Sequence, residues 1–146
     1  MFQSILVPID GSEHSRLALC VASKLARQED GRLVLLHIPE TLEHEPLLVW
    51  GIGAVPLGAT LEKREKLGRE LLDKASEEAR ALGVKDLDTV IGKGNPALSI
   101  LGEAKQRGVD AIVMGSRGLG DLRGLVVGSV SHKVSHGADC RVITVH

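Results

Sequence analysis

The chain has 146 residues, of which 43% are hydrophobic and 25% are charged, with a formal net charge of −1. This length suits one domain, over residues 1–146, that buries a core without metal ions or disulfides, and the near-neutral charge argues against a DNA-binding face. Aromatic side chains that stack on single-stranded nucleic acid are nearly absent, and no apolar run approaches the roughly 20 residues that span a bilayer.

The first predicted element is a strand over residues 4–9, a short apolar run typical of a strand buried on both faces of a parallel sheet. The turn Asp10-Gly11-Ser12 ends this strand, and Ser12 is a good N-cap for the helix that follows. Apolar residues recur in that helix at helical spacing, at Leu17, Ala18, Val21, Ala22 and Leu25. Residues 33–38 then predict a second strand.

Residues 39–60 alternate prolines and glycines without clean periodicity, so they predict a long loop or flap that carries Trp50. Helical spacing returns over residues 61–82, where each of several glutamates precedes a lysine or arginine by four positions on a solvated face. Residues 86–91 alternate in polarity and predict a strand at the edge of the sheet.

The second half of the chain continues the alternation of helices and strands. Asn95-Pro96 is typical of a helix start, with asparagine as the cap and proline at the first helical position. Two further strands are predicted over residues 111–114 and 142–145, with a short helix over about 129–136 between them.

The predicted order β-α-β-α-β-α-β-α-β indicates an α/β fold, an open five-stranded parallel sheet with right-handed crossovers and helices on both faces. In such sheets, ligands bind beyond the carboxyl ends of the strands, where the strand order reverses. If the first strand is central and the fourth lies beside it, the turn at residues 10–12 and the segment after residue 114 converge at that point.

That segment is the most unusual part of the chain, because five glycines fall within residues 115–128. Glycine lets backbone N–H groups approach an anion closely, and a helix that starts near Gly128-Ser129 adds its positive end. Arg117 and Arg123 add positive charge against one negative charge from Asp121. The pattern indicates phosphate binding, with a flexible connection that holds no ligand as the alternative. Neither a P-loop nor a dinucleotide-binding GxGxxG after the first strand is present.

The spacing Gly115-x2-Gly118-x9-Gly128-Ser129 resembles the ATP-binding signature of the universal stress protein family. Residues 5–12 resemble the family's opening strand and turn, residues 35–38 its second strand, and residues 113–118 and 128–131 its late motifs. The resemblance covers the whole chain and implies a Rossmann-like sheet with strand order 3-2-1-4-5.

The resemblance also implies an ATP site, with Mg²⁺ or Mn²⁺ held through the phosphates. Adenine would lie near Pro8, Asp10 and the backbone of Ile38, and the phosphates near the glycine-rich segment. The residues expected to bind the cofactor are Pro8, Ile9, Asp10, Ile38, Met114, Gly115, Arg117, Gly118, Gly128, Ser129, Val130 and Ser131.

Several of these residues have a simpler structural interpretation. Asp10 would accept hydrogen bonds from ribose or adenine or support the metal, or it would cap the first helix from its turn. Ser129 would contact phosphate, cap its helix, or do both. His132 and His136 have the four-residue spacing of metal ligands on a helix, but no carboxylate joins them, so a solvated or dimer-facing surface is the simpler interpretation.

No nucleophile elbow and no histidine–carboxylate pair tied to a nucleophile is visible in the sequence. We therefore expect an ATP-dependent regulatory protein of the stress response that acts on an unidentified protein partner. The alternatives are a slow Mg-dependent ATPase or nucleotidyl-transfer enzyme in which Asp10 supports the metal, and an interaction module whose glycine loop is only structural.

The N-terminus lacks the basic-then-apolar pattern of a signal peptide, so we expect a cytoplasmic protein. The last strand would lie at a sheet edge with unpaired backbone groups, which predicts a homodimer through residues 141–145. The chain has Ala138-Asp139-Cys140-Arg141 before that strand, where the family usually has Ala-Pro-Cys-Pro.

Overall fold

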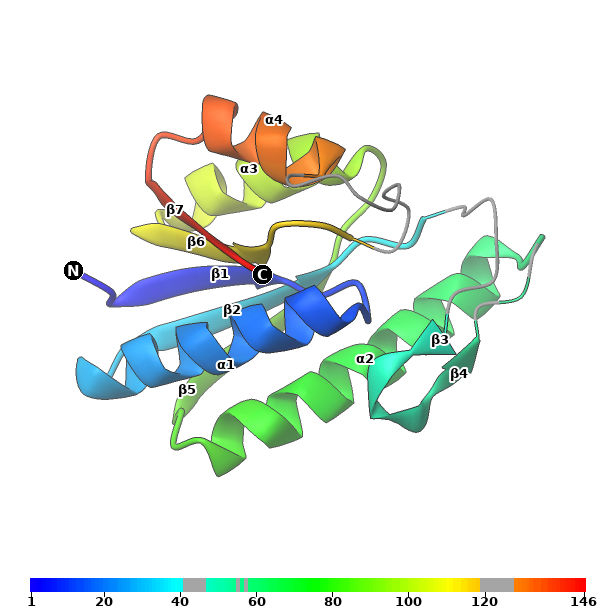
Figure 1. Ribbon diagram of the computed structural model, residues 1–146, viewed down its shortest axis with the longest axis horizontal. Coiled ribbons are helices and arrows are strands. Elements are labelled where there is room, and N and C mark those ends of the chain that lie inside the picture. The colour runs from blue at the N-terminus through cyan, green and yellow to red at the C-terminus, as the bar shows by residue number, and fades with distance from the viewer. Residues whose placement is uncertain (41–46, 55, 57, 119–127) are drawn as a thin grey trace.

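The structure, a computed structural model, describes residues 1–40, 47–54, 56, 58–118 and 128–146. Among the described residues, the five strands of the main sheet alternate with four helices along the chain (Figure 1). They are β1 Ser4–Pro8, α1 Glu13–Gln28, β2 Arg32–His37, α2 Leu61–Ala81, β5 Asp86–Ile91, α3 Pro96–Arg107, β6 Ala111–Gly115, α4 Ser129–Gly137 and β7 Arg141–Val145.

The five strands form one parallel sheet in the order β5-β2-β1-β6-β7, which confirms the predicted order 3-2-1-4-5. Helices α1 and α2 cover one face and α3 and α4 cover the other (Figure 1). Successive residues of β1 show why the strand is apolar throughout: Ile5 and Val7 belong to the core under α1 and α2, and Leu6 to the core under α3 and α4. All three side chains are fully buried.

Three of the helices begin at a side-chain cap, two of them, at Ser12 and Asn95, as predicted from the sequence. Ser12, Thr60 and Asn95 each accept a hydrogen bond from the backbone N–H three residues on, at 3.1–3.2 Å. Within the described residues, no helix combines the length and the apolar character that a membrane crossing requires.

Within residues 39–60, which the sequence predicts as a long loop or flap, residues 47–54 form secondary structure that the sequence does not predict. There the chain forms a small antiparallel hairpin, β3 Leu47–Leu48 and β4 Gly53–Ala54, joined by the short 3₁₀ helix Val49–Gly51. Strands of two residues are too short to show a periodicity in the sequence. Residues 41–46, 55 and 57 of the predicted loop lie outside the described residues.

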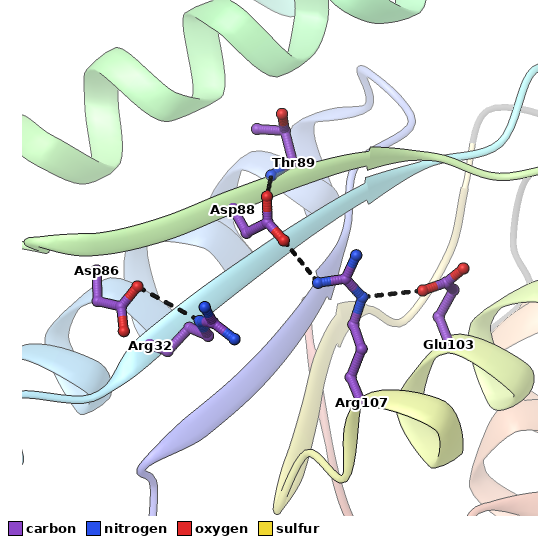
Figure 2. A network of polar contacts seen from close by, with 6 residues as sticks. All are labelled: Arg32, Asp86, Asp88, Thr89, Glu103 and Arg107. Carbon is purple, nitrogen blue, oxygen red and sulfur yellow. Dashed lines mark hydrogen bonds and ion pairs between the residues drawn. The ribbon is translucent and has the colours of Figure 1, made fainter.

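The edge position predicted for the third strand, β5, is confirmed. Two ion pairs tie this edge to its neighbours (Figure 2): Arg32 Nε lies 3.3 Å from Asp86 Oδ1, and Arg107 Nη1 lies 2.6 Å from Asp88 Oδ2. The hydrogen bond from Arg107 lowers the pKa of Asp88 below its usual value. Arg107 also pairs with Glu103 at 3.0 Å, so one guanidinium joins α3 to the edge strand.

Candidate functional site

A cavity of about 390 Å³, measured together with its open mouth, lies at the carboxyl ends of β1 and β2. It contains Asp10 and Ile38, two positions that the sequence predicted for one ligand. Helix α2 and the hairpin form the rest of its wall. The lining residues are Asp10, His37, Ile38, Pro39, Glu40, Leu48, Arg64, Leu67, Gly68 and Leu71.

His37 is the buried polar group of this cavity. Its Nδ1 lies 2.7 Å from the carbonyl oxygen of Ile9, and because a carbonyl only accepts, the ring proton is on Nδ1. Burial lowers the pKa of His37 below its usual value, against the opposing effects of the Ile9 carbonyl and the Asp10 charge. The imidazole is therefore neutral near pH 7, with Nε2 as an acceptor.

The turn after β1 places Asp10 at the cavity. Its Oδ1 accepts a hydrogen bond from the Ser12 N–H at 2.9 Å, while Ser12 itself caps α1. Asp10 thus stabilises the turn, whereas the N-cap of α1 is Ser12. Gly11 has φ +88°, and a Cβ there would stand 2.7 Å from Leu48 Cδ2, so glycine is required on both counts.

The two ends of the glycine-rich segment are fastened together at one carbonyl. The oxygen of Ser116 accepts from the Gly128 N–H at 2.6 Å and from the Ser131 hydroxyl at 2.7 Å. The N–H of Ser116 in turn donates to Val145 O at 2.8 Å, which ties this point to β7. The base of the segment is therefore held by the sheet, and the predicted cofactor residue Ser131 uses its buried hydroxyl to hold it.

Helix α4 begins differently from the other three helices. Its N-cap is Gly128, which makes no side-chain cap bond, so no cap side chain neutralises the positive end of the helix. The interpretation of Ser129 as the cap is wrong, because Ser129 occupies the first helical position with an exposed side chain. This helix start suits an anion, as the sequence predicted for a phosphate.

The predicted residues all lie at the carboxyl edge of the sheet, but in two groups. Pro8 is the last residue of β1, Ile9 and Asp10 follow it, and Ile38 follows β2, beside the cavity. Residues 114–118 lie at and just after the end of β6, the strand on the other side of β1, and residues 128–131 lie at the start of α4. Gly115 packs closely against the start of α1, the helix that follows the Asp10 turn, since a Cβ on Gly115 would stand 2.7 Å from His14 Cβ. Arg123 and Asp121 lie outside the described residues.

The histidine pair of α4 is on the surface. The rings of His132 and His136 meet edge to face, with centroids 4.3 Å apart. In the part of the chain that the structure describes, no group of three or more histidine, cysteine or acidic side chains could hold a metal ion. The pair is therefore two residues on an exposed helix face.

Sequence reasoning missed the contribution of α2 to the cavity. Arg64, Leu67, Gly68 and Leu71 come from this helix, whose charged face suggested only a solvated surface. One signal was available: a glycine in the middle of a helix costs about 1 kcal/mol relative to alanine, so Gly68 indicates a close contact. Its partner is His37, whose Nε2 would stand 2.9 Å from a Cβ on Gly68.

The fold and this edge define a Rossmann-like α/β domain with a candidate ligand site where its strand order reverses. The universal stress protein family matches residues 1–146. A universal stress protein of Bacillus subtilis, YxiE, is 40% identical over 148 residues, and one of Thermus aquaticus is 37% identical over 146 residues; each alignment covers 99% of both chains. The chain belongs to the universal stress protein family.

Solved structures of the family have the same fold. A universal stress protein in complex with cAMP superposes with a TM-score of 0.72 at 23% identity, over 99% of this chain and 96% of that one. A universal stress protein of Archaeoglobus fulgidus in complex with dAMP gives 0.73 at 21% identity, over 100% of both chains. An Arabidopsis thaliana member with AMP bound gives 0.65 at 23% identity, over 97% and 90%.

Proposed function

We propose that this chain is an ATP-binding regulatory protein of the stress response that works in the cytoplasm as a single domain. The observation that carries the proposal is the start of α4, where the N-cap is a glycine and so brings no capping side chain to the positive end of the helix. This helix start is joined to the glycine-rich segment at Ser116, beside the strand that leads to Asp10. Structural relatives solved with cAMP, dAMP or AMP support the binding of a nucleotide.

The described residues fit a nucleotide. The cavity beside Asp10 and Ile38 offers the base apolar side chains of Ile38, Leu48, Leu67 and Leu71 together with the neutral imidazole of His37. The phosphates would lie at the first-turn N–H groups of Ser129, Val130 and Ser131, near Gly115 and Gly118, with Arg117 adding positive charge. A divalent cation, Mg²⁺ or Mn²⁺, would neutralise the remaining phosphate charge when bound.

We infer that the protein also forms a homodimer through β7. This strand lies at one edge of the sheet, so one side of its backbone has no partner within the sheet. Pairing of Arg141–Val145 with a second copy would satisfy these groups symmetrically. Light scattering that gives a monomer at micromolar concentration would contradict the dimer. A protein partner would then recognise the nucleotide-loaded dimer.

Two measurements test ATP binding directly. The purified protein is denatured and any released nucleotide is identified by mass spectrometry, and the protein freed of nucleotide is titrated with ATP and Mg²⁺ by calorimetry. We expect release or binding of ATP. If no nucleotide is released and none binds up to millimolar concentration, the proposal is wrong.

A charge at the start of α4 tests the site itself. In Ser129→Asp, an exposed carboxylate at the first helical position stabilises the helix but repels phosphate. We expect ATP affinity to fall by about tenfold or more, equivalent to about 1.4 kcal/mol, with no loss of thermal stability. The control is Ser135→Asp, an exposed serine near the other end of the helix, which should bind ATP as the wild type does. Equal affinity in both variants would place the phosphates elsewhere.

The rate of ATP hydrolysis by the wild-type protein distinguishes a regulatory protein from an enzyme. Single-turnover assays should show hydrolysis far slower than about 1 s⁻¹, the low end of ordinary enzymes. A faster rate that is lost in Asp10→Asn, which retains the acceptor for the Ser12 N–H, would instead support a Mg-dependent ATPase.

A further inference from the structure

The β3–β4 hairpin shapes the cavity beside Asp10. Leu48, at the end of β3, is buried, lines the cavity and packs over Gly11. The next residue, Val49, donates its N–H to the Gly11 carbonyl at 3.0 Å. The position of the hairpin therefore fixes both the wall of the cavity and the turn that carries Asp10.

A second contact holds the hairpin at the side chain of Glu78. Trp50 Nε1–H donates to Glu78 Oε2 at 2.5 Å, and Arg16 Nε donates to the same oxygen at 3.3 Å. The Arg16 guanidinium also lies 5.7 Å from the centroid of the Trp50 ring, within the range of a cation–π contact. One carboxylate of α2 thus joins the hairpin to α1. We call Arg16, Trp50 and Glu78 the Glu78 cluster.

The hairpin needs such a contact because it has little stability of its own. Within the described residues, two residue pairs join its strands, Leu47 with Ala54 and Leu48 with Gly53. Isolated two-stranded hairpins are marginal in water. Trp50 also has φ +65°, a left-handed conformation that a bulky side chain adopts only where its surroundings hold it. The Glu78 cluster supplies those surroundings.

An indole can stack on a bound base, and Trp50 is the one indole of the chain. In the structure its ring packs against the core under α1 and α2, and it is not among the residues that line the cavity. Its contacts hold the hairpin instead.

We propose that Glu78 is a positioning residue of the nucleotide site: through Trp50 it holds the hairpin, so that Leu48 and the Gly11 turn keep the cavity in its binding shape. The proposal rests on the proposed function. None of the residues of the Glu78 cluster lines the cavity, so Glu78 acts on the ligand only through the hairpin. Ligand binding and the cluster stabilise the same hairpin position, and this coupling is reciprocal.

The hairpin and the nucleotide site can be measured separately, the hairpin by tryptophan fluorescence and the site by ATP affinity. Trp50 is the only tryptophan and the chain has no tyrosine, so emission reports the hairpin alone. Glu78→Ala removes the acceptor for Trp50 and Arg16, and Glu78→Gln keeps an oxygen acceptor but loses the charge. Glu77→Ala is the control, because the neighbouring Glu77 side chain is 69% exposed and pairs with Lys74 on the same helix.

We expect Glu78→Ala to shift Trp50 emission to longer wavelength, to increase quenching by acrylamide, and to weaken ATP binding with Mg²⁺ by about tenfold, the loss typical of one charge-assisted hydrogen bond. Glu78→Gln should lie between Glu78→Ala and the wild type. Glu77→Ala should match the wild type in emission, quenching and affinity. Circular dichroism shows whether each variant is folded, and if Glu78→Ala is not, Glu78→Gln decides.

Unchanged Trp50 emission in folded Glu78→Ala, or in Glu78→Gln if Glu78→Ala does not fold, would overturn the proposal, since the hairpin would not depend on Glu78. Shifted emission with unchanged ATP affinity would overturn it too, since the hairpin would not shape the site. If the wild type binds no nucleotide, the proposed function fails and with it the positioning role, whereas the emission shift separately shows whether Glu78 holds the hairpin.

Discussion

The imidazole of His37 lies against the backbone of Gly68, where α2 packs on the end of β2: a Cβ on Gly68 would stand 2.9 Å from His37 Nε2 and would overlap Cδ2. The ring cannot move aside easily, because it is buried and its Nδ1–H is held by the Ile9 carbonyl. The absence of a side chain at Gly68 therefore sets how closely α2 approaches the cavity.

Alanine at Gly68 tests this contact. In an ordinary helix interior, the exchange of glycine for alanine stabilises by up to about 1 kcal/mol. Here overlap with His37 opposes that gain, and overpacking of a buried site typically costs about 1–3 kcal/mol. We expect Gly68→Ala to lower the free energy of unfolding in urea. Gly102→Ala is the matched control, since nothing lies within 4 Å of a Cβ at Gly102 of α3, and it should be neutral or stabilising. A stabilised Gly68→Ala protein would contradict the close packing.

The buried neutral state of His37 predicts how stability depends on pH. Its pKa is lowered in the folded protein, so below the ordinary histidine pKa of about 6.5 the unfolded chain binds a proton that the folded chain resists. Stability should therefore fall as the pH drops from about 6.5 toward the lowered pKa, by at most about 1.4 kcal/mol per pH unit from this group.

The variant His37→Asn isolates that contribution. An asparagine amide can donate to the Ile9 carbonyl in place of Nδ1–H, but it does not titrate. The difference in unfolding free energy between wild type and His37→Asn, measured in urea from pH 8 to pH 5, should change in favour of the variant at the acid end. The other histidines cancel in this difference. A constant difference over the whole range would show that His37 is not held neutral by burial.

Sequence patterns were sufficient for the sheet because its central strands β1, β2 and β6 are nearly continuous apolar runs, and the alternation of strands and helices leaves few topologies. Sequence patterns do not predict the hairpin, since the two-residue strands Leu47–Leu48 and Gly53–Ala54 are too short to show a periodicity of polar and apolar residues. Their position depends on tertiary contacts of Leu48 and Trp50 with distant parts of the chain, which local patterns do not encode.

The candidate site, too, could be predicted from the sequence only in part. Its place at the carboxyl edge follows from topology, and Asp10 and Ile38 do share a cavity. For Ser129 the sequence leaves a phosphate contact, a helix cap or both open, and in local terms serine is a better cap than glycine. In the structure, Gly128 takes the cap position, where its N–H bonds to Ser116 across the base of the glycine-rich segment. A long-range hydrogen bond outweighed a local preference.

Removal of the Ser131 hydroxyl should loosen the base of that segment. Ser131→Ala loses the bond of 2.7 Å to Ser116 O and leaves the Gly128 N–H as the bond that closes the base. We expect a loss of about 1–2 kcal/mol in the free energy of unfolding, because the hydroxyl is buried and its acceptor loses a partner. ATP affinity should weaken as well, since the start of α4 is then held less firmly.

Ser135→Ala, at an exposed serine of the same helix, should change neither the free energy of unfolding nor the ATP affinity. Equal effects of the two substitutions would contradict a role for Ser131 at the base.

The edge ion pair between Asp88 and Arg107 predicts a second, different dependence on pH. The pKa of Asp88 is lowered in the folded protein, so its contribution to stability is complete above the unfolded pKa of about 3.9 and is lost as the pH falls through the lowered pKa. The Asp88 side chain is 46% exposed, so solvent screening keeps this contribution at about 0.5–1 kcal/mol.

In Asp88→Asn, the amide oxygen still accepts from Arg107, but the charge is gone. The stability difference from wild type should stay constant between pH 8 and 5, where that of His37→Asn changes, and should shrink below about pH 4 and in high salt. Urea unfolding at each pH measures it, and a difference that varies between pH 8 and 5 would mean that the edge strand is stabilised by something other than this carboxylate.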